Sequence, residues 1–233
     1  MEIRINKYLS SAGVCSRREA DRLIAEGRVR IDDNIADMGS KVCDGQIVYV
    51  DGKPVKQEEE MILLAVNKPV GIVCTTTDKQ GSNNIVDFVG YSKRVYPIGR
   101  LDKDSQGLIL MTNNGGIMDK ILRSANGHEK EYIVEVDKDI NETFIKKMSA
   151  GVYLTELERK TKPCKVYKES KRRFRIILTQ GLNRQIRRMC KELGYNVKTL
   201  KRIRIMNICL GDLPIGAVRE VTDEEYKLLL KML

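Results

Sequence analysis

Residues 96–116 read YPIGRLDKDSQGLILMTNNGG, and this stretch places a cluster of charges directly before an apolar run at residues 108–112. Short apolar runs bounded by Gly and Asn are typical of buried strands. The charged residues are Arg100, Asp102, Lys103 and Asp104. Unpaired charge at the mouth of a buried strand is costly, so these side chains either hold a metal ion, take part in chemistry, or lie solvated in a turn. The stretch by itself leaves all three possibilities open.

Around this stretch, the chain alternates between strand-like and helix-like segments. Runs rich in Ile, Val and Leu predict strands at residues 62–67, 71–75, 108–112, 131–136 and 174–179. Helices are predicted at residues 116–124, 142–150, 184–193 and 223–232, the last of which opens with capping-box spacing between Thr222 and Glu225. Strands and helices in this order predict a mixed α+β domain.

The first 50 residues predict a smaller module of two helices and two strands. A helix over residues 5–12 ends at Gly13, and a second begins at Ser16, has Glu19 at capping-box spacing, and ends at Gly27. Strands follow near residues 29–31 and 46–50. The next stretch, DGKPVKQEEEM, is polar and has no apolar periodicity. We therefore expect a small domain at residues 1–52, a linker at 53–61 and a second domain at 62–233.

The charge of the chain is unevenly distributed. Lys and Arg total 42 against 32 acidic residues, a net charge of +10. Residues 160–204 hold 16 basic and two acidic residues, which leaves 26 basic and 30 acidic residues elsewhere. Residues 1–30 hold seven basic and four acidic residues. Such segregation indicates a surface that meets a polyanion, with nucleic acid as the first candidate, although an ordinary solvated basic surface is the alternative.

The helix predicted at residues 184–193 carries two stripes. The apolar stripe has the spacing of a buried face and consists of Ile186, Met189, Cys190 and Leu193. The basic stripe has the same spacing two residues out of phase and consists of Arg184, Arg187, Arg188 and Lys191. At about 100° per residue the two stripes face nearly opposite directions. We expect the basic stripe to bind phosphate or to neutralise a carboxylate.

Several classes of protein are excluded by what the sequence lacks. The six cysteines are far apart and form no CxxC pair, which argues against zinc ribbons and disulfide frameworks. The single histidine, His128, lies in a polar segment, and the sequence has neither a GxxxxGK[ST] loop nor a GxGxxG motif after a strand. No run approaches the roughly 18 apolar residues of a membrane span, and the start of the chain does not resemble a secretory signal. We expect a cytoplasmic protein that needs no cofactor and binds no metal.

A series of motifs resembles the ribosomal RNA pseudouridine synthases that join an S4-type RNA-binding domain to a catalytic domain. The motifs are INKYLSSAGVCSRREADRLIAEGRV for the S4 domain, then NKPVGIVCT, GRLDKDSQGLILMTNNG, HEKEYIV and LTQGLNRQIRRMC for the catalytic domain. Together they span nearly the whole chain. The resemblance implies a largely antiparallel sheet with flanking helices. Glycine at position 99, directly before Arg100, resembles the pattern of the family members that modify a single ribosomal site. Within that subgroup, the motifs most resemble the type acting on large-subunit 23S ribosomal RNA. A monomer without an obligate protein partner is the default expectation.

The resemblance also implies roles for individual residues. Asp102 corresponds to the essential aspartate, which attacks the target nucleoside either at the uracil ring or through the ribose. Tyr132 corresponds to the residue that stacks on the target base, and Arg187 to the basic partner of the aspartate, whereas Asp104 has no implied role. The residues expected to contact RNA are Arg4, Lys7, Arg17, Arg18, Arg22, Arg28, Arg100, Lys130, Arg184 and Arg188.

The chemistry of this isomerisation agrees with the residue types. The N-glycosidic bond breaks, the uracil turns while it stays bound, and the ribose rejoins C5 without net oxidation or hydrolysis. An arginine directs the carboxylate, an aromatic face holds the loose base, and basic surfaces offset the cost of flipping the uridine out of the RNA. Two alternatives stay open: an RNA-binding ribosome-assembly factor without catalysis, and a magnesium-dependent nuclease built on Asp102 and Asp104.

Overall fold

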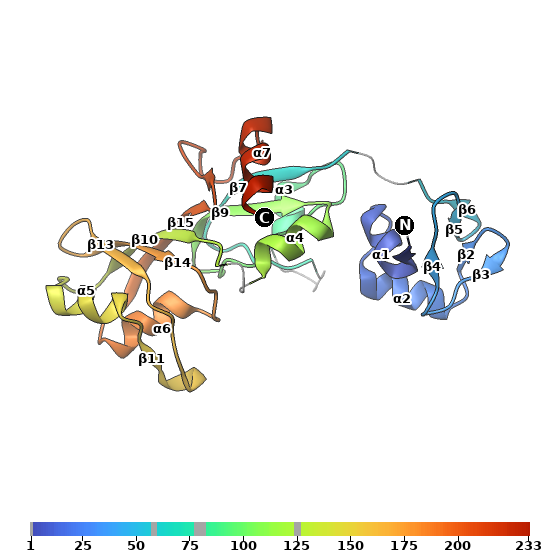
Figure 1. The fold of residues 1–233 in the computed structure, drawn as a ribbon. Helices are drawn as coiled ribbons and strands as arrows, with labels where there is room; N and C mark the ends of the chain where they lie inside the picture. Colours follow the sequence, from blue (N-terminus) through green and yellow to red (C-terminus); the bar gives the residue numbers. More distant parts are fainter. Residues whose placement is uncertain (1, 57–59, 77–82, 124–126) are drawn as a thin grey trace. The chain divides into compact units, whose positions relative to one another are not determined.

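The computed structural model describes residues 2–56, 60–76, 83–123 and 127–233 (Figure 1). The chain divides into two compact units. The first contains Met1–Met61, Ser92–Arg94 and Asn113–Gly115, and the second contains Ile62–Tyr91, Val95–Thr112 and Gly116–Leu233. Within the described residues, no helix is both long and apolar enough to cross a membrane.

The N-terminal unit packs two helices against short strands. The helices are α1 (Ile5–Ser11) and α2 (Arg17–Ala25). A four-stranded sheet has the order β3 (Asn34–Ile35), β2 (Val29–Ile31), β5 (Val48–Val50) and β6 (Lys53–Pro54), and β1 (Ile3–Arg4) pairs separately with β4 (Lys41–Val42). The Ser16 side chain accepts a hydrogen bond from the Glu19 backbone N–H at 3.1 Å, as the capping spacing predicted. Leu9, Leu23 and Val48 lie in one buried core.

The start of the predicted linker belongs to this unit. Lys53 and Pro54 pair with β5, and the Val55 N–H donates to the Val48 carbonyl. β5 and β6 are joined by a tight turn at Asp51 and Gly52, both of which have positive φ angles. The polar composition of this stretch gave no indication of the second strand. Residues 57–59 of the predicted linker lie outside the described residues.

A mixed sheet forms the centre of the second unit. Its order is β13 (Lys165–Lys168), β14 (Arg173–Leu178), β10 (Lys130–Val136), β15 (Val197–Ile205), β9 (Gln106–Thr112), β7 (Leu63–Lys68) and β17 (Val218–Glu220). Two short strands join it at the side, β8 (Tyr96–Pro97) on β9 and β16 (Ile208–Cys209) on β15. The β9–β15 pairing is parallel and the other pairings between described strands of this sheet are antiparallel, which confirms the predicted α+β fold with a largely antiparallel sheet.

Among the described residues, five helices accompany this sheet (Figure 1). They are α3 (Ile85–Val89), α4 (Gly115–Leu122), α5 (Glu142–Ser149), α6 (Gln185–Glu192) and α7 (Asp223–Met232). Phe144 of α5 and Met189 of α6 are buried in the same core as Phe174 of β14. The capping box predicted for α7 is present between Thr222 and Glu225. A hairpin of β11 (Tyr153–Leu154) and β12 (Arg159–Lys160), joined by the 3₁₀ turn η2 (Thr155–Leu157), precedes β13.

One predicted strand was wrong and one long strand was not predicted. Residues 71–75 form only an isolated bridge at Val73, because Gly71 has a φ of +97° and continues a turn after β7. The unpredicted strand is β15, whose inward positions include the charged Arg202. The helix predicted at 116–124 ends at Leu122, and residue 124 lies outside the described residues.

The parallel pairing of β9 and β15 positions the charged stretch that precedes β9. Arg202 pairs with Gly107, and Lys201 with Gln106. Gly107 has a φ of +108°, and a Cβ placed there would lie 2.3 Å from the Arg202 carbonyl oxygen. Only glycine permits this conformation and this close backbone approach. On its other side β15 pairs with β10, so the turn before β9 and the first residues of β10 lie at the same part of the sheet.

Candidate active site

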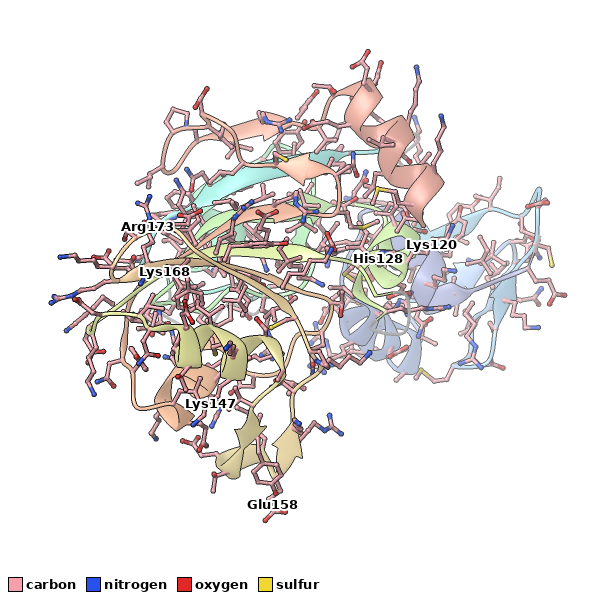
Figure 2. The ribbon with its side chains drawn as sticks, turned by 60° about the vertical axis from the view of Figure 1, so that its left-hand side comes forward. Lys120, His128, Lys147, Glu158, Lys168 and Arg173 are labelled. Carbon is pink, nitrogen blue, oxygen red and sulfur yellow. The ribbon has the colours of Figure 1, made fainter. Side chains whose placement is uncertain are left out.

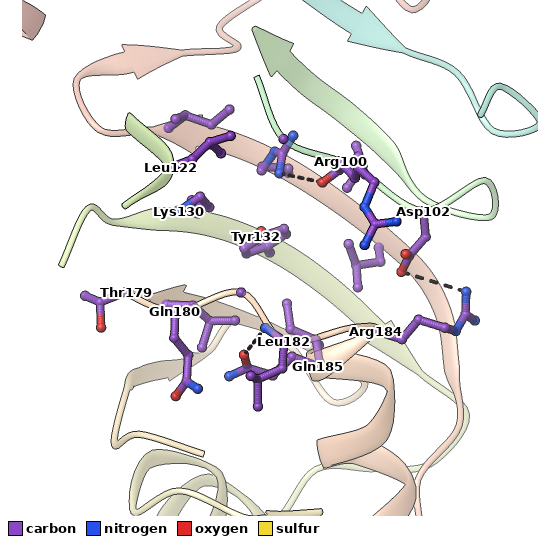
Figure 3. Close-up of a pocket in the computed structure, with 18 of the residues that line it drawn as sticks. Arg100, Asp102, Leu122, Lys130, Tyr132, Thr179, Gln180, Leu182, Arg184 and Gln185 are labelled. Carbon is purple, nitrogen blue, oxygen red and sulfur yellow. Dashed lines mark hydrogen bonds and ion pairs between the residues drawn. The ribbon is translucent and has the colours of Figure 1, made fainter. Parts of the chain in front are cut away.

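A cavity of about 200 Å³ lies between the turn before β9, the start of β10, β15 and the segment that leads into α6 (Figure 3). Asp102 and Arg100 line it from the turn, and Tyr132 and Lys130 line it from β10. Arg184, Arg187 and Arg202 complete its charged lining. The structure therefore brings together all three residues expected to be catalytic and three of those expected to contact RNA.

Backbone contacts hold the charged turn in place. The Ser105 N–H donates to the Asp102 carbonyl at 3.0 Å, and the Gly71 N–H donates to the Lys103 carbonyl at 2.8 Å. The Leu101 N–H donates to the buried Cys74 thiol at 3.4 Å. Because these partners come from the turn after β7 as well as from the charged turn itself, the position of Asp102 is fixed by two segments of the chain.

A fully buried lysine shapes the supporting turn. The Lys68 ammonium donates to the carbonyls of Pro69 and Ile72, each at 2.9 Å. Burial lowers the pKa of Lys68, and the charges of Cys74, Arg202 and Asp102 act on the pKa in smaller measure. A buried ammonium needs such acceptors, so Lys68 closes the turn that holds Leu101 and Lys103.

Asp102 and Asp104 meet the arginines of α6 differently. The Arg184 guanidinium donates to both carboxylate oxygens of Asp104, at 2.7 and 3.0 Å, and its Nη1 lies 3.8 Å from Asp102 Oδ2. Arg187 Nη2 donates to the Asp104 carbonyl at 2.8 Å and to Ser105 Oγ at 3.2 Å. The ion pair of Asp102 is thus with Arg184, whereas Arg187, expected to be the partner of Asp102, anchors the backbone beyond it.

These contacts affect the two carboxylates unequally. The hydrogen bond from Arg184 holds the pKa of Asp104 below its ordinary value. Asp102 has a side chain that is 32% exposed and faces the cavity with a longer, looser contact to the same arginine. Asp102 is oriented by Arg184 but is not held by it in a bidentate hydrogen bond, so its carboxylate oxygens remain accessible to a substrate atom.

Backbone strain directs Arg184 into this position. Arg184 is the N-cap of α6 and has a φ of +51° and a ψ of +34°, the left-handed conformation. This conformation costs about 1 kcal/mol for a residue other than glycine and is concentrated at functional sites. Within the same turn, the Gln185 side chain accepts a hydrogen bond from the Leu182 N–H at 3.0 Å. This turn places the Arg184 side chain next to Asp102 and Asp104.

Tyr132 offers the cavity an aromatic surface. It lies on β10 two residues after Lys130, on the same face of the strand, and both side chains face the cavity (Figure 3). Burial, followed by the charge of Arg202, lowers the pKa of Lys130. The guanidinium of Arg202 lies 6.0 Å from the centre of the Tyr132 ring, a distance at the outer limit of a cation–π contact.

Arg202 is the main residue of the site that sequence reasoning missed. It is 3% exposed, and its Nε donates to the Leu108 carbonyl at 2.6 Å while Nη1 reaches the Arg100 carbonyl at 3.4 Å. It therefore ties β9 and the turn that carries Asp102 to β15, beside Tyr132. Leu200 and Arg202 occupy alternate, inward positions of β15, which is the pattern of a strand. The strand was not predicted because a charged residue stands at one of these inward positions.

The remaining residues expected to contact RNA lie on other surfaces. In the N-terminal unit, Arg4, Lys7, Arg17, Arg18, Arg22 and Arg28 are all exposed. Arg22 pairs with Glu19 and Glu26 of its own helix, and Arg28 pairs with Glu26 and Asp51. Arg188 lies on α6 outside the cavity of Asp102 and contacts Glu156. Among the described residues, no group of three or more His, Cys, Asp and Glu side chains is placed to hold a metal ion.

Comparisons with known proteins converge on one family. The sequence profile of the RNA pseudouridylate synthase family matches residues 62–192, and the profile of the S4 domain matches residues 3–48. The chain is 55% identical over 233 residues to the dual-specificity RNA pseudouridine synthase RluF of Escherichia coli strain K12, covering 99% of this chain and 79% of that protein. It is 35% identical over 234 residues to the ribosomal large subunit pseudouridine synthase B of Bacillus subtilis strain 168, covering 97% of this chain and 95% of the relative.

A solved structure agrees with this similarity. The crystal structure of a pseudouridylate synthase superimposes with a TM-score of 0.72 at 25% sequence identity, and the match covers 97% of this chain and 99% of the other. The match extends over both units of the chain in sequence, as do the two relatives.

Proposed function

The chain belongs to the RNA pseudouridine synthases with an N-terminal S4 domain, which are isomerases, and from this membership we propose that it converts a specific uridine of ribosomal RNA to pseudouridine with Asp102 as the reacting carboxylate. The observation that carries the proposal is the single cavity in which Asp102, Tyr132 and Arg184 meet. A large-subunit 23S substrate is supported by the name of the Bacillus subtilis relative, a ribosomal large subunit pseudouridine synthase.

The reaction rearranges bonds within one nucleoside. The bond between C1′ of the ribose and N1 of uracil breaks, the base turns within the cavity, a bond forms between C1′ and C5, and the C5 proton leaves while N1 gains one. Asp102 acts either by adding to the uracil ring or through the ribose. In both cases the isomerisation neither gains nor loses electrons overall, so its chemistry requires no cofactor.

The other lining residues act on Asp102 or on the base. Arg184 directs the Asp102 carboxylate through the 3.8 Å ion pair and stabilises charge that develops on it. Tyr132 stacks on the flipped uracil and keeps it in the cavity while it turns. Arg187 and Arg202 fix the turn that carries Asp102 from its two sides, through the Asp104 and Arg100 carbonyls. We assign Arg100 and Lys130 to contacts with the RNA around the displaced uridine.

The basic residues outside the cavity provide binding energy. We assign the N-terminal unit through β6, slightly longer than residues 1–52, and the outer face of α6 to contacts with RNA phosphates. Such contacts offset the few kcal/mol that extrusion of a base costs. They recognise the shape and charge of the RNA more than its sequence.

The test is release of tritium from C5 of uridine. Large-subunit ribosomal RNA transcribed with [5-³H]uridine is incubated with the protein in the presence and in the absence of EDTA, and the label released to water is counted. We expect one equivalent per RNA, with the RNA intact on a denaturing gel. Cleavage that EDTA stops would support a magnesium-dependent nuclease. Binding without release, repeated with small-subunit RNA and immature ribosomal particles, would overturn catalysis and leave an RNA-binding assembly factor.

A further inference from the structure

A second cavity adjoins the active site on the outer face of α6. It is lined by Glu156, Arg184, Arg187, Arg188, Lys191, Tyr195, Asn196 and Val197. Arg184 and Arg187 line both this cavity and the cavity of Asp102. Four of the lining residues are cations and one is a carboxylate. The second cavity therefore carries a net positive charge and shares two arginines with the cavity of Asp102.

The single carboxylate, Glu156, occupies the cationic side of this cavity. Its Oε1 lies 2.9 Å from the Lys191 ammonium, and its Oε2 contacts the Arg188 guanidinium. Arg188 Nε also donates to the Asn183 carbonyl at 3.0 Å, which orients its guanidinium toward the hairpin. Glu156 is half exposed and Lys191 is 73% exposed, so an incoming anion can reach both groups of the pair.

The hairpin that carries Glu156 is fixed to α6. The Thr155 N–H donates to Glu192 Oε1 at 2.9 Å and the Thr155 hydroxyl donates to Glu192 Oε2 at 3.1 Å. Leu154, immediately before, is fully buried in the core. Because the residues on the N-terminal side of Glu156 are anchored, its carboxylate is held against Arg188 and Lys191 by the fold of η2.

We propose that this cavity binds a backbone phosphate of the RNA next to the target uridine, and that Glu156 is a built-in counter-ion which the phosphate displaces. The inference rests on the proposed function and adds to it a phosphate site and a competing group. Phosphate oxygens take the same acceptor positions as a carboxylate opposite a guanidinium fork and an ammonium. An exposed ion pair contributes little stability, so a phosphate that brings many other contacts can replace it. RNA bound elsewhere on the protein does not displace Glu156, so the counter-ion lowers the affinity only of RNA whose phosphate enters this cavity.

The experiment compares Glu156→Gln with a matched variant, Glu158→Gln. Glu158 lies in the same hairpin, is exposed (Figure 2), and has no ion-pair partner within the part of the chain that the structure describes. Both variants change the net charge of the full chain by the same amount. The dissociation constant for large-subunit ribosomal RNA is measured by filter binding at several salt concentrations. Thermal unfolding of both variants reports whether the hairpin stays folded.

Glu156→Gln should bind about fivefold tighter at low salt, because the phosphate no longer displaces a carboxylate. The plot of log affinity against log salt should steepen by roughly 0.7, the value of one additional released counter-ion on single-stranded RNA. Glu158→Gln should change both quantities less. Lys191→Gln should weaken binding more in the Glu156→Gln background than in the wild type, because the lysine then contacts phosphate alone.

Equal effects of Glu156→Gln and Glu158→Gln would overturn the inference, since only net charge would matter. Weaker binding together with a lower melting temperature in Glu156→Gln, while Lys191→Gln has the same effect in both backgrounds, would also overturn it and leave Glu156 as a structural staple. Tritium release by the wild type is measured in parallel. If the predicted binding changes occur but the wild type releases no tritium, the proposed catalysis is rejected and the phosphate site is kept. If the wild type releases tritium but Glu156→Gln and Glu158→Gln have equal effects on binding, the catalysis is kept and the phosphate site is rejected.

Discussion

The arginines of the two units are used in different ways. In the N-terminal unit, Arg22 is 60% exposed and pairs with carboxylates three and four residues away on its own helix. In the catalytic unit, Arg187 is 15% exposed and contacts Asp104 and Ser105, more than 80 residues earlier in the sequence. Local, exposed pairs contribute little to stability and are screened by salt. Pairs between distant elements define the geometry of a site.

Because of this difference, we expect the two groups of arginines to affect RNA affinity and the rate of the chemical step separately. We expect the exposed arginines on α2 to contribute to RNA affinity in a salt-dependent way without positioning any reacting atom. Arg184 and Arg187 hold the acidic turn against α6, so we expect their substitution to change the chemical step. Variants of the two groups should therefore change different measured quantities.

The largest effect is expected from Asp102→Asn. The rate of tritium release should fall at least about 10³-fold, in the range for loss of a central catalytic group, with RNA affinity within twofold of the wild type. The matched variant Asp104→Asn removes a carboxylate that Arg184 already occupies and should lose about tenfold by loosening Arg184. Both are measured by single-turnover label release. An active Asp102→Asn protein would refute the assignment of the reacting group.

A large loss of stability is expected from Gly107→Ala. The new Cβ would lie 2.3 Å from the Arg202 carbonyl, and the backbone has a φ of +108°. Strain and steric overlap at the β9–β15 pairing should cost about 3 kcal/mol or more. Urea unfolding measures the cost, with Gly181→Ala as the control because its Cβ would meet no atom within 4 Å. Similar unfolding midpoints for the two variants would show that the close approach of β9 and β15 is not required.

Arg184→Gln should lower the single-turnover rate about 100-fold, as loss of one preorganised charge at a reacting group does. The half-saturating protein concentration should change much less, because the Arg184 guanidinium is already paired with Asp102 and Asp104. The RNA phosphate is expected to contact Arg188 and Lys191 instead. Arg184→Lys should restore part of the rate by replacing the charge without the fork. A rate within threefold of the wild type for Arg184→Gln would contradict a role at the chemical step.

The same variant predicts a difference in acid stability. The folded pKa of Asp104 is depressed by Arg184, so the pair stabilises the fold above the ordinary carboxyl pKa of 3.8 and the contribution is lost as the pH falls through the depressed value. The melting-temperature gap between wild type and Arg184→Gln should be largest near pH 7 and shrink below pH 3.8. The control is Lys147→Gln, which removes a cation without an ion-pair partner among the described residues. A gap independent of pH would contradict this linkage.

The smallest effect is expected from Arg18→Gln in the S4 domain. Arg18 is exposed on α2 and has no ion pair among the described contacts. Removing one phosphate contact should reduce the salt dependence of log affinity by about 0.7 to 0.9 and leave the rate at saturating protein unchanged. Filter binding between 50 and 200 mM salt measures the slope. An unchanged slope would remove Arg18 from the RNA surface.

Much of this arrangement followed from local patterns in the sequence. Capping spacing at Ser16 and at Thr222 placed α2 and α7, and the two stripes of residues 184–193 placed the buried and basic faces of α6. The resemblance to a family identified Asp102 and Tyr132 before their proximity was visible. These features depend on neighbours within a few residues, or on motifs that a family shares.

The rest depended on contacts that spacing does not encode. β15 was missed because Arg202 occupies an inward position, where its Nε and Nη1 donate to the carbonyl oxygens of Leu108 and Arg100, about 100 residues earlier in the sequence. The strand expected at residues 71–75 is reduced to an isolated bridge at Val73, because Gly71 continues the turn after β7 and the buried Lys68 donates to the Ile72 carbonyl. That Arg184 reaches Asp102 while Arg187 holds the backbone follows from the left-handed conformation at Arg184.

The most direct test of this division is the dependence of the single-turnover rate on protein concentration for Arg184→Gln and Arg18→Gln, measured on one preparation of 23S ribosomal RNA labelled at C5. We expect Arg184→Gln to lower the plateau of the curve and leave its midpoint nearly unchanged, and Arg18→Gln to move the midpoint and leave the plateau unchanged. A lowered plateau for Arg18→Gln, or a shifted midpoint with a full plateau for Arg184→Gln, would contradict it.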